Sequence, residues 1–83
     1  MPYSVYILYS VKLDKYYTGS CADICIRLTQ HNGGRNISTA NGRPWILKYI
    51  EAYESRSLAF KREQAIKKKK SRKYIEWLIS SVG

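Results

Sequence analysis

Two segments rich in β-branched and aromatic residues lie close together in the chain, and they constrain its fold more than any other feature. Residues 3–10 (Tyr-Ser-Val-Tyr-Ile-Leu-Tyr-Ser) and 16–20 (Tyr-Tyr-Thr-Gly-Ser) have the composition of strands. The residues between them, Lys12 to Lys15, are typical of a hairpin loop. Strands joined by so short a connection pair antiparallel, so the sequence predicts a β-hairpin.

The alternation of side chains divides the first strand into two faces. One face carries Tyr3, Val5, Ile7 and Tyr9, and the other carries Ser4, Tyr6, Leu8 and Ser10. Gly19 interrupts the second strand. A glycine inside a strand indicates a bulge or a close approach of another group to the backbone.

A short helix is expected over residues 22–32, with Asp23 as its N-cap and Gly33-Gly34 at its end. Ile24, Leu28 and His31 share one side of this helix. Residues 33–44 then form a polar loop of about twelve residues, which is long for a compact domain and typical of a binding loop.

Residues 45–53 resume a strand pattern and predict a third strand. Ser55 or Ser57 caps a helix that ends near residue 69, and Ser71 caps a last helix. The order is β-β-α-β-α-α, without the alternation of a βαβ fold. We therefore expect one α+β domain over residues 1–83, with a three-stranded antiparallel sheet flanked by three helices.

The net charge of +9 is concentrated in one stretch. Residues 56–73 hold nine basic residues against Glu63 alone, so that stretch carries +8. Such a field attracts polyanions, although a solvated basic surface is the simpler alternative. The candidate nucleic-acid contacts are the basic residues of the loop and of this stretch: Arg35, Arg43, Arg62, Lys67, Lys68, Lys69, Lys70, Arg72 and Lys73.

Other features exclude several classes of protein. No apolar run approaches the roughly 20 residues of a membrane span, and the basic stretch lacks the broad apolar face of a helix lying on a bilayer. The start of the sequence does not resemble a secretory signal, so a cytoplasmic protein is expected. Cys21 and Cys25 are expected to be reduced thiols, as is usual for a cytoplasmic protein. A structural zinc site is not expected, because the sequence has a single His and no CxxC motif. Nothing suggests an obligate protein partner, and a monomer is expected.

Five residues could support chemistry together. Tyr6 and Tyr17 lie on neighbouring predicted strands, Arg27 and His31 lie four apart on one helix, and Glu63 is the only acid of the basic stretch. Taken singly, each has a simpler interpretation. A strand Tyr usually packs, Arg and His on a short helix usually lie at the surface, and a Glu among lysines usually forms an ion pair.

Taken together, these residues resemble the GIY-YIG nuclease family, in particular its small single-domain bacterial branch. Residues 4–6 (Ser-Val-Tyr) match the first tripeptide of that family, and residues 17–19 (Tyr-Thr-Gly) match the second. Arg27 occupies the place of the family's helix arginine, and Glu63 that of its metal-binding glutamate. The chain departs at Ser4, where the family has glycine, and residues 71–75 lack the Asn that many active relatives carry.

The resemblance implies a metal-dependent DNA endonuclease or nickase, of weak or structure-specific activity, in DNA repair or processing. The six acids are scattered, so one Mg²⁺ or Mn²⁺ held by Glu63, waters and the phosphate suits the chain better than two metals. Arg27 would clamp the phosphate. The general base is Tyr6, Tyr17 or His31, and the sequence does not choose among them.

Two alternatives remain beside the enzyme. The missing Asn and the lack of an attached targeting domain favour a non-catalytic module that binds nucleic acid, DNA or RNA, on the same scaffold. A basic domain that binds an acidic protein would also explain the lysine run.

Overall fold

The computed structural model describes residues 3–34 and 40–81, and it has the predicted α+β order. Strands β1 (Tyr3–Ser10), β2 (Lys15–Cys21) and β3 (Trp45–Tyr53) form one antiparallel sheet in the order β2-β1-β3. Helices α1 (Ile24–Asn32), α2 (Arg56–Lys69) and α3 (Arg72–Ser81) pack on it. A 3₁₀ turn, Ala40–Gly42, lies in the segment expected to be only loop. Otherwise the predicted elements are confirmed, with boundaries shifted by one or two residues.

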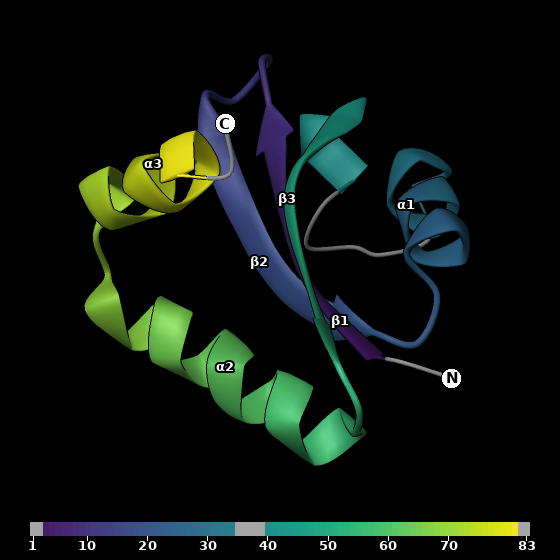
Figure 1. Ribbon diagram of the computed structural model, residues 1–83. Coiled ribbons are helices and arrows are strands. Elements are labelled where there is room, and N and C mark those ends of the chain that lie inside the picture. Colours follow the sequence, from purple (N-terminus) through teal and green to yellow (C-terminus); the bar gives the residue numbers. More distant parts are fainter. Residues whose placement is uncertain (1–2, 35–39, 82–83) are drawn as a thin grey trace.

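The sheet separates two hydrophobic cores, because the central strand β1 is buried on both faces (Figure 1). Val5 and Ile7 pack on one face with residues of α2 and α3. Tyr6 and Leu8 pack on the other face with residues of α1 and β3. The faces follow the alternation read from the sequence, and α1 lies on the opposite side of the sheet from α2 and α3.

The helix starts were also read correctly. Asp23 caps α1 by accepting from the amide of Ile26 at 3.1 Å. Ser55, rather than Ser57, caps α2, and Ser71 accepts from the amide of Tyr74 ahead of α3. Within the described residues, both cysteines are free thiols, and no helix is long and apolar enough to cross a membrane.

Candidate active site

The Tyr6 phenol and the His31 imidazole form a buried polar pair between β1 and α1. The Tyr6 hydroxyl lies 3.1 Å from His31 Nε2, and neither residue is more than 1% exposed. The apolar side of α1, with Ile24 and Leu28, packs in the same core and turns His31 toward the sheet. The pair therefore depends on the docking of α1 onto β1.

Burial shifts the pKa of both members toward the neutral form. Desolvation raises the pKa of Tyr6 well above its ordinary value, and Tyr17 adds to this rise while Arg27 opposes it. Desolvation, followed by the charge of Arg27, lowers the pKa of His31. At neutral pH both groups are un-ionised, which makes Tyr6 a poor phenolate base.

Gly19 makes room for the Tyr6 phenol where it passes under β2. Gly19 faces Tyr6 in the strand register, and a Cβ there would lie 2.5 Å from the Tyr6 hydroxyl. The close approach predicted at this glycine is therefore confirmed. Beside it, the half-buried ring of Tyr17 stands edge-on to His31, with ring centroids 5.0 Å apart. The Tyr6 and Tyr17 centroids are 6.3 Å apart.

Glu63 approaches the same edge of the sheet from α2. The residue is 8% exposed, and its carboxylate has two partners. The Ser20 hydroxyl donates to Oε1 at 2.6 Å, and the Lys67 ammonium lies 2.6 Å from Oε2. Ser20 follows Gly19 in β2, so its side chain faces α2. The hydrogen bond from Ser20 thus holds the Glu63 carboxylate against β2, the strand that carries Tyr17.

Arg27 reaches this region from α1. It is half-buried and lines, together with Ser20, a cavity of about 360 Å³. Its charge and that of Glu63 act on the Tyr6 phenol in opposite senses, since Arg27 lowers the pKa of Tyr6 and Glu63 raises it. Side chains of β1, β2, α1 and α2 therefore lie around the edge strand β2, with Glu63 on its α2 side and the Tyr6–His31 pair on its α1 side.

Glu63 fits the chemistry of a single divalent ion. Across residues 3–34 and 40–81, no three His, Cys, Asp or Glu side chains gather as a metal site. Mg²⁺ commonly binds through one or two carboxylates and keeps several waters, a requirement that one carboxylate meets. Lys67 holds one oxygen of that carboxylate, so an ion at Glu63 must share it with Lys67 or displace the ammonium.

The lysines at the end of α2 differ in their surroundings. Lys67 and Lys70 line a cavity of about 440 Å³ next to Tyr17, and the Lys67 ammonium lies 6.0 Å from the centre of the Tyr17 ring. All four lysines of this run are exposed, as is Lys73 of α3, but Lys68, Lys69 and Lys73 do not line this cavity. Their contacts to nucleic acid stay a prediction.

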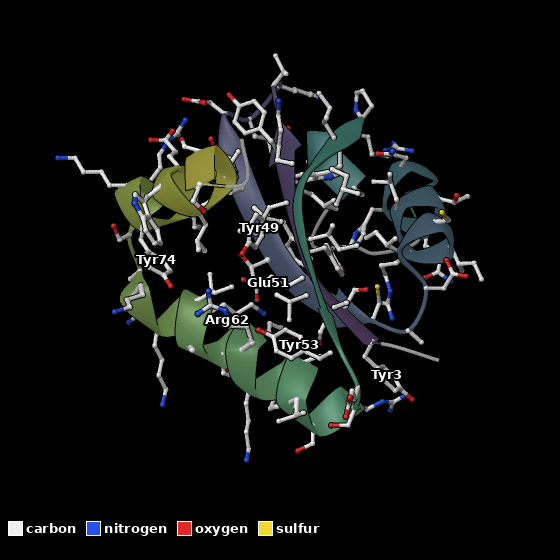
Figure 2. All side chains as sticks on the ribbon, viewed as in Figure 1. Tyr3, Tyr49, Glu51, Tyr53, Arg62 and Tyr74 are labelled. Atoms are coloured by element: carbon white, nitrogen blue, oxygen red, sulfur yellow. The ribbon has the colours of Figure 1, made fainter. Side chains whose placement is uncertain are left out.

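Arg62 points to the sheet rather than to solvent (Figure 2). Its Nε and Nη2 donate to the two oxygens of Glu51 at 3.0 and 3.2 Å, and Nη1 donates to the Tyr74 hydroxyl. Tyr49 and Tyr53 also donate to Glu51. This set, hereafter the Glu51 network, joins β3, α2 and α3. A role for Arg62 in binding nucleic acid would compete with it.

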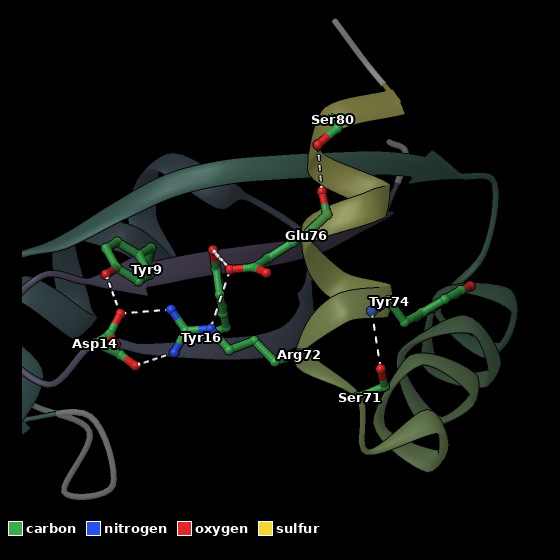
Figure 3. A network of polar contacts seen from close by, with 8 residues as sticks. All are labelled: Tyr9, Asp14, Tyr16, Ser71, Arg72, Tyr74, Glu76 and Ser80. Atoms are coloured by element: carbon green, nitrogen blue, oxygen red, sulfur yellow. Dashed lines mark hydrogen bonds and ion pairs between the residues drawn. The ribbon is translucent and has the colours of Figure 1, made fainter.

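Arg72 is engaged in a similar way at the surface (Figure 3). Its Nη2 lies 2.7 Å from Asp14 Oδ1, and its Nε lies 3.2 Å from Glu76 Oε2. The ion pair between Arg72 and Asp14 connects the β1–β2 turn to α3. Arg43 is exposed and donates to the carbonyl of Ala40. Arg35 lies outside the described residues.

Sequence reasoning missed some residues of this region. Ser20 carried no signal, because a serine beside a glycine in a strand has no expected partner. Lys67 was assigned to phosphate, whereas the spacing of four residues from Glu63 already favoured an ion pair on α2. Arg56 and Phe60, which line the Arg27 cavity, could be placed there only once α2 was docked.

Comparison with known proteins identifies the family of this chain. A family model described as the GIY-YIG catalytic domain matches residues 2–75. The chain therefore belongs to the GIY-YIG domain family, which is a family of nucleases.

The relatives it resembles carry the name UPF0213. A UPF0213 protein of Halobacterium salinarum is 40% identical over 53 residues, covering 63% of this chain and 69% of that protein. A UPF0213 protein of Staphylococcus aureus is 44% identical over 52 residues, covering 61% of this chain and 63% of that protein. The solution NMR structure of a UPF0213 protein from Bacillus halodurans superposes with a TM-score of 0.59 at 33% identity, covering 96% of this chain and 84% of that one.

Proposed function

We propose that the protein is a metal-dependent DNA endonuclease or nickase. One observation carries the proposal: the Tyr6–His31 pair, Tyr17, Arg27 and Glu63 lie around the edge strand β2, with Glu63 on its α2 side and the Tyr6–His31 pair on its α1 side. Membership of a nuclease family supports the same activity. DNA repair or processing is the setting that such an activity suggests, with an unusual DNA structure as the preferred target.

In this proposal Arg27 and Glu63 divide the work of binding. Arg27 presents a planar guanidinium to two oxygens of the scissile phosphate, a geometry that lysine cannot reproduce. Glu63 holds one Mg²⁺ or Mn²⁺. Such an ion, when bound, neutralises charge on the phosphate and lowers the pKa of a water ligand.

The pKa shifts favour a relay over a phenolate. The Tyr6 hydroxyl stays protonated, and His31 stays neutral, so that its Nε2 can accept the hydrogen bond of the phenol. Tyr6 then serves as a hydrogen-bonding bridge toward His31. The half-buried Tyr17 is the second candidate, because it is the more accessible of the two phenols.

The test is the substitution Glu63→Gln with plasmid nicking as the readout. Glutamine keeps the size and the hydrogen bond from Ser20 but gives up the charge, so Mg²⁺-dependent nicking should fall at least a hundredfold, about 2.7 kcal/mol or more of lost transition-state stabilisation. Glu54→Gln removes an exposed acid and should leave nicking unchanged. Wild-type protein that cuts no duplex, branched or single-stranded DNA with Mg²⁺ or Mn²⁺ would refute the proposal.

A non-catalytic module that binds nucleic acid is the second candidate. The observation that favours it is the occupied carboxylate, since Ser20 and Lys67 already take both oxygens of Glu63. In that case nucleic-acid binding should fall with salt and survive Glu63→Gln unchanged, and no condition should give cleavage.

A further inference from the structure

Two cavities lie in line along the edge strand β2, one on each side of Glu63. The smaller, of about 360 Å³, is bounded by the end of β2 near Cys21 and by Arg56 and Phe60 of α2. The larger, of about 440 Å³, is bounded by the start of β2 near Tyr16 and by Lys67 and Lys70. Between them, the Ser20–Glu63 hydrogen bond crosses from β2 to α2. The two cavities and the bridge between them are hereafter called the β2–α2 groove.

Both ends of the groove combine positive charge with aromatic surface. Arg27 and Arg56 line the smaller cavity beside Tyr3 and Phe60, and no acidic residue is among the described residues that line it. Phe60 is 54% exposed, although it is large and apolar. Nucleic-acid strands are bound by this pairing, since cations meet phosphates and aromatic rings stack on bases.

The larger cavity has the same character. Lys15, Lys67 and Lys70 line it together with Tyr17. Its one acid, Asp14, is already paired with Arg72. The net charge of the lining therefore remains positive.

The length of the groove suits a short strand. A helix rises about 1.5 Å per residue, so Arg56 and Lys70 lie roughly 21 Å apart along α2. A stacked strand advances about 3.4 Å per nucleotide, so the groove spans about six stacked nucleotides and fewer when the strand is extended. Each cavity is of the size that holds one small ligand, about 300–1,000 Å³.

We propose that the β2–α2 groove binds one unpaired nucleic-acid strand across Glu63. Arg56 contacts a phosphate and Phe60 stacks on a base at one end, and Lys70 contacts a phosphate at the other. The position of the scissile phosphate at Glu63 rests on the proposed function. The strand-binding role does not, because it follows from the linings of the two cavities. The preferred DNA would then carry an unpaired segment at the cut, as in a flap or an open end.

A binding assay without turnover tests this inference. The Glu63→Gln protein, kept in EDTA, is titrated into a fluorescent oligothymidylate of about eight nucleotides and into a blunt duplex of similar length. Phe60→Ala should weaken the single strand about tenfold and leave the duplex unchanged, because paired bases cannot stack on the ring. Arg56→Ala and Lys70→Ala should each flatten the salt dependence of log K by about 0.7 for the single strand.

Two variants on the same helix serve as matched controls. Lys61 and Leu58 are exposed on α2 and line neither cavity. Lys61→Ala should therefore have a smaller effect on the salt dependence than Arg56→Ala, and Leu58→Ala should leave oligonucleotide affinity unchanged. Equal effects of control and groove variants, or equal loss of duplex binding in Phe60→Ala, would overturn the groove.

The two proposals fail separately. If the groove variants behave as expected while wild-type protein with Mg²⁺ cuts nothing, the groove stands and the nuclease proposal falls. If wild-type protein nicks DNA and the groove variants bind oligothymidylate normally, the nuclease proposal stands and the groove falls.

Discussion

Two carboxylates of this protein each meet a basic residue of α2, and they do so in opposite surroundings. Glu51 receives hydrogen bonds from Arg62, Tyr49 and Tyr53, so both of its oxygens are held from several directions. Glu63 receives one from Ser20 and one from Lys67, whose side chain is 45% exposed. Both acids are largely buried, yet only Glu63 depends on a partner that is itself exposed to solvent, the Lys67 ammonium.

The pKa shifts in the Glu51 network show that the Glu51 carboxylate is fully paired. Burial alone would raise the pKa of Glu51, but hydrogen bonds from Arg62 and from Tyr49 and Tyr53 outweigh it and hold that pKa below its usual range. Burial, reinforced by Glu51, raises the pKa of Tyr49 to about 12. Such a network stabilises the docking of α2 and α3 on β3 and leaves no oxygen for a ligand. The difference teaches that neighbouring residues of one helix can have different surroundings: Arg62 joins a packing network, whereas Glu63 keeps one exposed partner at the proposed site.

The largest effect is expected on stability, when Arg62 is removed from the Glu51 network. Arg62→Met leaves the Glu51 carboxylate without its cation, and the free energy of unfolding should fall by about 2 kcal/mol. Urea denaturation measures this, and Lys61→Met at the exposed neighbouring position should change it by less than about 0.5 kcal/mol. Unchanged stability together with weakened DNA binding would instead make Arg62 a contact to nucleic acid.

Removing the ammonium from the Glu63–Lys67 pair should change the affinity of Glu63 for a divalent ion. Lys67→Met removes the ammonium that holds Glu63 Oε2, and the affinity for Mn²⁺ should rise about tenfold, about 1.4 kcal/mol, because the ion no longer competes with it. Electron paramagnetic resonance of free Mn²⁺ measures the change. Lys68→Met alters the net charge equally without touching Glu63, so equal gains in both variants would show that only the general field had changed.

The smallest effect is expected on the pH dependence of stability, through His31 of the Tyr6–His31 pair. The pKa of His31 is lowered in the folded state, so the unfolded chain takes up a proton first as pH falls through about 6.5. The stability of the native state is then fully present above pH 6.5 and declines below it. Between pH 7.5 and 5.5 we expect a loss of about 1 kcal/mol, absent in His31→Gln. The window lies above the one in which Glu51 is protonated.

Much of the fold could be read from local patterns. Alternation in residues 3–10 assigned Val5 and Ile7 to one core and Tyr6 to the other, since a strand side chain has only two directions to point. Asp23 and Ser71 marked helix starts because capping is a contact within a few residues. The 3₁₀ turn at Ala40–Gly42 was missed, since so short an element has no periodicity to detect.

For the candidate site, the sequence predicted which residues to consider but not what surrounds them. The residues of the GIY-YIG pattern were found by order and spacing along the chain, which also placed Arg27 and His31 on one helix. Their surroundings were not predictable in the same way. The partner of Arg62 is Glu51 on β3, which no local pattern indicates, whereas the pairing of Lys67 with Glu63 follows from their spacing on one helix.

By itself the sequence determined the order of elements, the two faces of β1 and the identity of the residues that could act, because each depends on neighbours within a few positions. Only the tertiary structure decided that the Tyr6 phenol meets His31 beneath Gly19, that Ser20 donates to Glu63, and that cavities flank that carboxylate. Those contacts join residues 25 and 43 positions apart. They form only when both faces of the sheet are covered, since docking α1 and α2 is what fixes their distances.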